Sequence, residues 1–368
     1  MNEISKAMMH KVLVLLAAIA VGLTTAAAAA QTSVIGPITF SGYNLGPLVN
    51  PNGAGAPVAG QQGWSGGSCG LPSTGADEAV VNNAAFPSAG LPPGLSLRFS
   101  SAYESGCFDD LFTPVLQVKG GAPGALVWVS GGPMVPCTTT SCQPYFETSW
   151  TVASATGGYQ PGLTVDFSPS AGPTGARTAQ VRMKHTTDNT GKQILQILAS
   201  DVEGYCRTGT PAGTVGNCGT SFFNSAPCYQ CANFTAYYTV GNYDPTKQHK
   251  IKLTMQMGPG PDNDIVQIYV DDALAFSGLS WSGYYWYDTE SARGNPGLQA
   301  GRASDTVLIR AGSAPAIGTL NYGYLLSNIT LCSAPNAAAC GTTLTANFQS
   351  ARRGLSSGAV RVQHRQPR

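Results

Sequence analysis

Alternation of apolar and polar side chains with a period of two is the feature that most restricts the fold of this chain. In the segment 249–257 apolar residues occupy every second position, and lysine, threonine or glutamine fills the positions between them. The segments 145–152 and 179–185 alternate in the same way. Such alternation places apolar side chains on one face of a strand and polar ones on the other. For the first segment, the residues predicted to face the core are Ile251, Leu253, Met255 and Met257.

Further short strands are predicted along the chain, separated by clusters of Gly, Pro, Asn and Asp. Only 11% of the residues are charged, compared with about 25% in ordinary soluble domains. Amphipathic surface helices need charged faces, so this composition disfavours a helical protein. We therefore predict an all-β fold, an antiparallel β-sandwich of the jelly-roll type stapled by disulfides, in one domain over residues 31–340.

Both ends of the chain differ from this body. Residues 1–30 combine basic residues, an apolar run at 12–23 and three alanines at 28–30, which predicts a secretory signal peptide. The apolar run is shorter than the roughly 20 residues of a membrane span. Residues 341–368 lack strand or helix periodicity and hold several arginines but no acid after 341, which predicts a disordered basic tail. The expected location is secreted, either extracellular or periplasmic, without a membrane span after signal removal.

Ten cysteines, an even number, lie beyond residue 30, and secretion favours their pairing in disulfides. Short separations suggest the pairs Cys137–Cys142 and Cys332–Cys340, and they leave Cys69–Cys107 as a plausible early pair. The remaining four cysteines cluster in the sequence and are compatible with two disulfides or with one zinc site, and a redox CxxC is the least favoured reading. These four are Cys206, Cys218, Cys228 and Cys231.

The run HKIKLTMQM, followed by NDIVQIYVDDALAFSG, resembles the back-sheet meander of concanavalin A-like, or laminin G-like, sandwiches. In that pattern a strand of the type H-x-I-x-I/L precedes V-x-V-Y-V-D-G. Asp272 stands where the pattern prefers glycine, and aspartate tolerates a positive φ better than most residues. The run NYGYLLSNITL resembles the closing strand, and other segments resemble secreted bacterial proteins of this fold with no known function. The resemblance implies the fold and says little about activity.

Because this fold includes glycoside hydrolases, carboxylate pairs are the first catalytic candidates. The glucanase run Glu-x-Asp-x-x-Glu is absent, and only the spaced pairs Asp201/Glu203 and Asp288/Glu290 occur. A lyase would place Arg, His, Tyr and Gln together, but Arg182 and the nearby histidine fall on opposite faces of their predicted strand. The catalytic residues are therefore unknown, and the sequence leans against an enzyme.

Aromatic residues carry the stronger binding signal. Five rings fall within 281–287, and a further tryptophan lies in a Gly-rich segment expected to form an exposed loop. Aromatic planes stack against sugar rings, although the same rings can instead stabilise a core. The predicted glycan-contacting residues are Trp281, Tyr285, Trp286 and Trp64.

A structural calcium ion is the one cofactor considered. Asp262, Asp264 and Asp271 supply hard oxygens near one predicted hairpin, and calcium takes six to eight such ligands. The alternative is a solvated acidic turn without any cofactor.

The leading functional prediction is a secreted, non-catalytic protein that binds glycans or another surface. One alternative is a glycoside hydrolase or lyase that acts on polysaccharide, and another is a structural extracellular protein without a small ligand. The expected partner is a neutral polysaccharide or a cell-surface glycan. A net charge of +1 argues against nucleic acid as a partner.

Overall fold

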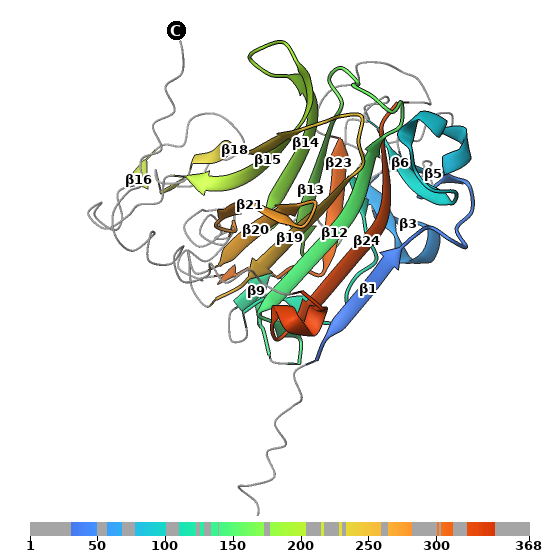
Figure 1. Ribbon diagram of the computed structural model, residues 1–368. Helices are drawn as coiled ribbons and strands as arrows, with labels where there is room; N and C mark the ends of the chain where they lie inside the picture. Colours follow the sequence, from blue (N-terminus) through green and yellow to red (C-terminus); the bar gives the residue numbers. More distant parts are fainter. Residues whose placement is uncertain are drawn as a thin grey trace, which may run out of the picture.

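The structure is a computed structural model, and the side chains and backbone discussed below belong to the part of the chain that it describes (Figure 1). The described residues are 31–49, 57–67, 78–100, 110–122, 126–128, 134–138, 140–172, 177–203, 215–216, 228–229, 233–258, 264–281, 300–301, 303–311 and 322–342. The predicted signal peptide and all but the first two residues of the predicted tail lie outside these ranges.

Two large sheets, built from antiparallel pairs, form the body of the protein. Sheet A has the order β2-β5-β6-β24-β12-β19-β20-β21, with β1 also paired to β24, and sheet B has the order β18-β15-β14-β13-β23-β7-β4-β3. The strands of sheet A are β1 (Ser33–Ile38), β2 (Gly46–Pro47), β5 (Glu78–Asn82), β6 (Leu95–Phe99), β12 (Tyr145–Ser154), β19 (His249–Gln256), β20 (Ile265–Val270), β21 (Ala273–Gly278) and β24 (Tyr324–Ala334). Those of sheet B are β3 (Pro57–Ala59), β4 (Ser65–Gly67), β7 (Asp110–Phe112), β13 (Thr164–Ser170), β14 (Gln180–Thr187), β15 (Gln193–Glu203), β18 (Asn233–Tyr243) and β23 (Thr306–Ala311).

Small elements complete the described residues, in which the only helices are short 3-10 turns. They are β8 (Lys119–Gly120), β9 (Leu126–Trp128), β10 (Met134–Pro136), β11 (Cys142–Gln143), β16 (Val215–Gly216), β17 (Cys228–Tyr229), β22 (Ala300–Gly301), η1 (Gln61–Gly63), η2 (Asn83–Ala85), η3 (Pro87–Ala89) and η4 (Ala337–Cys340). None of these helices is long and apolar enough to cross a membrane.

The core lies between the two sheets, whose layers Figure 1 shows one behind the other. Trp150 of β12 stacks on Phe167 of β13, with ring centroids 4.2 Å apart and planes 5° from parallel. This contact joins the centres of both sheets. The predicted antiparallel β-sandwich is thus confirmed, and so is the register of the strand at 249–257. The predicted core residues of that strand are all buried: Ile251, Leu253, Met255 and Met257.

The hairpin between β20 and β21 explains the departure at Asp272 from the preferred glycine. Asp271 and Asp272 have φ of 51° and 65°, both in the left-handed region. Two successive residues with positive φ are what a two-residue type I′ hairpin turn requires. Aspartate accepts this conformation, so the meander forms without glycine.

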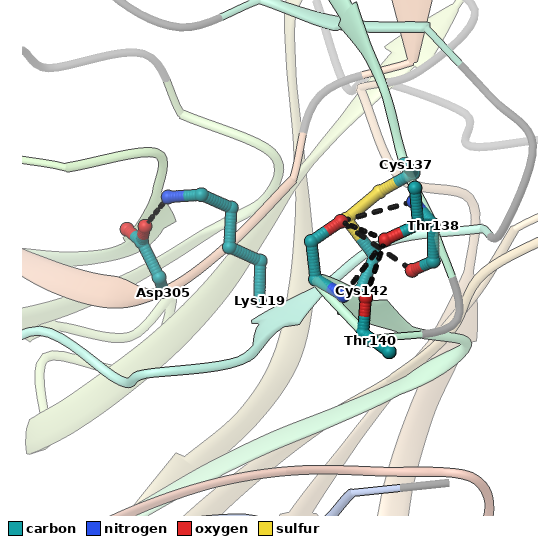
Figure 2. The surroundings of a disulfide bond; sticks show 7 residues. Lys119, Cys137, Thr138, Thr140, Cys142 and Asp305 are labelled. Carbon is teal, nitrogen blue, oxygen red and sulfur yellow. Dashed lines mark hydrogen bonds and ion pairs between the residues drawn. A yellow bond between two sulfur atoms is a disulfide. The ribbon is translucent and has the colours of Figure 1, made fainter. Parts of the chain in front are cut away.

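Two of the expected disulfides are confirmed, Cys137–Cys142 and Cys332–Cys340. The first lies near an ion pair between Lys119 and the fully buried Asp305 (Figure 2). Because Asp305 also accepts a hydrogen bond from the Gly172 amide at 2.6 Å, this carboxylate joins β8 to the connection after β13. The disulfide bonding of the other six cysteines stays a prediction, since Cys69, Cys107, Cys206, Cys218 and Cys231 lie outside the described residues and the side chain of Cys228 is not described.

The Cys332–Cys340 disulfide ties η4 to the last strand of sheet A, and η4 contacts both β12 and β24. Tyr145 and Glu147 point away from the core residues of β12, yet they are only 0% and 8% exposed. Tyr145 donates a hydrogen bond to Glu147 Oε2 at 2.7 Å, and burial together with this carboxylate raises the pKa of Tyr145 well above its usual range. The C-terminal end of the domain therefore covers part of the outer face of sheet A.

Candidate functional site

Four charged residues form a row across the outer face of sheet B. Arg182 of β14 lies opposite Asp166 of β13, which lies opposite Arg310 of β23. Asp110 of β7 completes the row. In the antiparallel pair of β23 and β7, Ile309 lies opposite Leu111, so the next residues, Arg310 and Asp110, are neighbours, and Arg310 binds Asp110. We call these four residues the charged row. Their charges alternate in sign from one strand to the next.

Each arginine in the row binds one aspartate through two hydrogen bonds. Arg182 donates from Nε and Nη2 to the two oxygens of Asp166, both at 2.7 Å. Arg310 binds Asp110 through the same two nitrogens. Bidentate pairs of this kind are both strong and geometrically specific. Burial lowers the pKa of Arg182, but the bonds and charge of Asp166 outweigh it and hold that pKa above its ordinary value. The row is therefore a rigid, charged surface.

A tyrosine adds an aromatic plane to this face. Arg182 Cζ lies 4.4 Å from the ring centroid of Tyr237 on β18, and Gln180 Nε2 donates to the Tyr237 hydroxyl at 3.3 Å. Burial raises the pKa of Tyr237, against the opposing charge of Arg182. The phenol is thus protonated at neutral pH, and it offers a hydrogen-bond donor beside a ring that is 39% exposed.

Further hydrogen-bonding side chains, one of them a lysine, flank the charged row. Thr164, Lys184, Gln196 and Asn242 occupy facing positions on β13, β14, β15 and β18, one register step from the row. The amides of Gln196 and Asn242 and the ammonium group of Lys184 can bind hydroxyl groups of a ligand, whereas Thr164 is 3% exposed and donates its hydroxyl to Gly162 O. We call this surface, formed by the charged row, Tyr237, Gln180 and these four residues, the polar face.

Trp64 does not lie in an exposed loop, so that prediction is wrong. Its side chain is 1% exposed, and its Nε1 donates to the Tyr43 hydroxyl at 3.1 Å. The ring also lies 6.0 Å from that of Phe40. Gly60 and Gly66, on either side of Trp64, lie close against Val49. The large apolar ring gains more free energy inside the core than in water.

Trp281 is also buried, with 1% exposure. Its backbone amide donates to Thr178 O at 2.7 Å, and its Nε1 donates to Ser200 O at 3.1 Å. Arg177 lies over the ring at 5.0 Å. This tryptophan fastens the chain after β21 to the ends of β14 and β15, so it anchors a segment and does not present its ring to a ligand. Tyr285 and Trp286 lie outside the described residues.

The structure does not bring the predicted calcium ligands together. Asp264 and Asp271 lie immediately before and after β20, a strand of six residues. At about 3.3 Å per residue their α-carbons are roughly 20 Å apart, too far to share one ion. Asp264 accepts hydrogen bonds from the Gly258 amide and the Ser280 hydroxyl, while Asp271 accepts from the Lys250 amide. Asp262 lies outside the described residues, which hold no group of three His, Cys, Asp or Glu suited to a metal ion.

His185 lies in the core, on the opposite face of β14 from Arg182, as the alternation predicts. Its side chain is 1% exposed and its Nδ1 accepts a hydrogen bond from the Gln160 amide at 2.8 Å. Burial lowers the pKa of His185 to about 4. A neutral core histidine of this kind cannot act on a ligand at the polar face.

The charged row was not found from the sequence. Its ion pairs join residues 16 and 200 positions apart, so no local motif contains them. Part of a usable signal was present, because alternation over 179–185 already placed Arg182 on the polar side of its predicted strand. What was missing was the order of the strands in sheet B.

No protein-family model and no curated protein matches this chain. Solved structures match distantly. An endo-β-1,4-glucuronan lyase from the fungus Trichoderma reesei is 11% identical, with a TM-score of 0.31 over 70% of this chain and 84% of its own. The β-agarase A from Zobellia galactanivorans is 8% identical (TM-score 0.32, 82% and 92% coverage), and a Bacillus licheniformis β-glucanase is 11% identical (TM-score 0.30, 78% and 98%). Likenesses with TM-scores this low do not bear on the ligand or the activity of this chain.

Proposed function

We propose that this protein is a secreted, non-catalytic glycan-binding β-sandwich that holds polysaccharide on the polar face of sheet B. The observation that carries the proposal is the charged row with Tyr237 packed against it. The row combines fixed donors and acceptors with an aromatic plane on a rigid sheet. The disulfides agree with an oxidising environment outside the cytoplasm.

A glycan suits this surface better than an apolar ligand would. Sugar hydroxyls need donors and acceptors held at fixed positions, and the bidentate pairs hold Arg182 and Asp166 in place. The exposed part of the Tyr237 ring offers a plane for a sugar ring to stack on. Since all four charges of the row are already paired, hydrogen bonding and stacking would supply much of the affinity.

The aromatic segment 281–287 is also part of the proposed binding site, although its first residue, Trp281, is buried and does not contact the glycan. Trp281 binds the carbonyl of Ser200, and Ser200 lies opposite both Gln180 and Tyr237 in sheet B. The segment therefore starts next to the polar face. We propose that Tyr285 and Trp286 contact the glycan from the rim, while Trp281 positions them.

Affinity electrophoresis of the mature protein through gels containing different polysaccharides tests the proposal. Tyr237→Ala should weaken retention about tenfold, which corresponds to about 1.4 kcal/mol of binding free energy. Asn328→Ala, an exposed polar site on sheet A, is the control and should bind as wild type does. Equal binding by the two variants would reject the polar face as the site, and absence of binding to every polysaccharide would favour a structural protein without a small ligand.

Cleavage of polysaccharide is the second candidate, because the polar face carries two carboxylates, Asp110 and Asp166. They lie on strands separated only by β23, so their α-carbons are about 10 Å apart. Inverting glycosidases hold their carboxyl groups about 6.5–9.5 Å apart. Release of reducing ends or of unsaturated uronic ends by wild type, and its loss in both Asp110→Asn and Asp166→Asn, would replace the non-catalytic proposal. Activity that survives both changes would exclude these two residues from catalysis.

A further inference from the structure

We propose that the ligand of the polar face is an anionic polysaccharide, whose carboxylate or sulfate groups bind Arg182 and Lys184. The inference rests on the proposed function and names the chemical class of the ligand. It differs from the neutral glycan that the low charge content of the sequence favours.

Arg182 has donors to spare for an anion. Asp166 occupies Nε and Nη2 only, and within the described part of the chain Nη1 has no hydrogen-bond partner. The guanidinium is nevertheless fixed in place, between the two oxygens of Asp166 and the ring of Tyr237. Its side chain is 23% exposed, so a ligand can reach it. A fixed guanidinium with unused N–H groups binds carboxylate or sulfate without losing much side-chain entropy.

Lys184 lies two positions further along β14 and therefore on the same face, roughly 7 Å from Arg182 along the strand. Its cross-strand neighbours, Thr164 and Gln196, are uncharged. No carboxylate pairs with Lys184 among the described residues, and the row's two aspartates are each bound to an arginine. Two neighbouring cations with free donors create a local positive potential that an anionic group would neutralise.

The charges on the polar face add up to a local excess of one cation. Three basic side chains, Arg182, Lys184 and Arg310, stand against Asp110 and Asp166. The whole chain carries a net charge of only +1, so attraction of polyanions by the protein as a whole is weak. Affinity for an anionic glycan would therefore come from this face.

The test compares three polymers: polygalacturonate, dextran sulfate and neutral dextran. Wild type, Lys184→Gln and Lys252→Gln are run in parallel by affinity electrophoresis, with folding checked by circular dichroism. Lys252 is the matched control, because it projects from a central strand on the outer face of sheet A. All three proteins carry the same arginine-containing C-terminal segment, so any contribution of that segment cancels in the comparison.

We expect wild type to be retained by polygalacturonate or by dextran sulfate, and the stronger of the two identifies the anionic group. Lys184→Gln should weaken this retention about tenfold, Lys252→Gln by less than twofold, and Lys184→Arg should restore it. Retention by neutral dextran that equals retention by the polyanions would overturn the inference and leave the proposed function standing. Equal loss in the two glutamine variants would also overturn it, while absence of retention by any polysaccharide, including the wider panel above, would overturn both proposals.

Discussion

Acid should destabilise this protein through His185, whose protonated form has no favourable place in the core. Nδ1 of His185 accepts a hydrogen bond from the Gln160 amide, so a proton on Nδ1 would set a donor against a donor. The side chain of Gln160 in turn binds both backbone groups of Gly323, at 2.8 and 2.7 Å. The ring is also enclosed by Tyr159 and Tyr324, at centroid distances of 5.8 and 5.2 Å. Protonation would thus disturb the connection between β12 and β13.

The magnitude follows from linkage between proton binding and folding. Burial lowers the pKa of His185 from 6.5 to about 4. Between these values the unfolded chain binds a proton that the folded protein refuses, so the free energy of unfolding falls as the pH falls through this window. For these two pKa values, the loss from pH 7 to pH 5 is about 2 kcal/mol, and it approaches about 3 kcal/mol below pH 4.

The assay is urea unfolding followed by tryptophan fluorescence, at pH 7 and pH 5, for wild type and His185→Gln. Glutamine can accept the Gln160 hydrogen bond and does not titrate. The stability of wild type relative to the variant should shrink by about 2 kcal/mol between the two pH values, whatever the fixed cost of the substitution. His185→Phe should give the same pH-dependent difference. If the wild-type and variant stabilities run parallel over this range, the histidine is not the acid-sensitive group and the reasoning is refuted.

Three further predictions concern the core and the cysteines. Leu253→Ala should cost about 2–5 kcal/mol in urea unfolding, whereas the outward-facing Lys252→Ala should cost less than about 1 kcal/mol, and equal costs would contradict the register of β19. Trp150→Phe should lower the free energy of unfolding by less than about 1.5 kcal/mol, because it removes a buried Nε1 that has no partner among the described residues. Phe167→Ala should lower it by about 3–5 kcal/mol. A larger loss for Trp150→Phe than for Phe167→Ala would show that the indole nitrogen is hydrogen-bonded. Thiol titration in denaturant without reductant should find no free thiol among the ten cysteines, whereas four free thiols and one bound zinc would indicate a metal site at the four clustered cysteines.

Local sequence patterns were enough to predict the all-β fold class and, for several strands, which side chains face the core. Side-chain alternation repeats every two residues because successive residues of a strand face opposite ways, so Leu253 and Lys252 could be assigned to opposite faces without knowing any neighbour. The two confirmed disulfides close loops with sequence separations of 5 and 8. Short loops bring their ends together at little entropic cost, so disulfides between cysteines that are close in sequence can be predicted from the sequence.

Sequence proximity misled wherever the chain between two residues is extended. Asp264 and Asp271 are close in number, but β20 carries them apart, so they cannot form one calcium site. Trp64 lies among glycines that suggested an exposed loop, yet it is 1% exposed and contacts Phe40 and Tyr43. Burial of a single ring depends on what packs over it, which is decided elsewhere in the chain.

The sequence by itself therefore determined that the chain forms half-buried antiparallel strands, which side of several strands faces the core, and which nearby cysteines pair. Only the tertiary structure decided that β14, β13, β23 and β7 lie side by side and so align Arg182, Asp166, Arg310 and Asp110 in one row. The physical reason is range: strand periodicity and short loop closure act over a few residues, whereas strand order results from packing two whole sheets around one core.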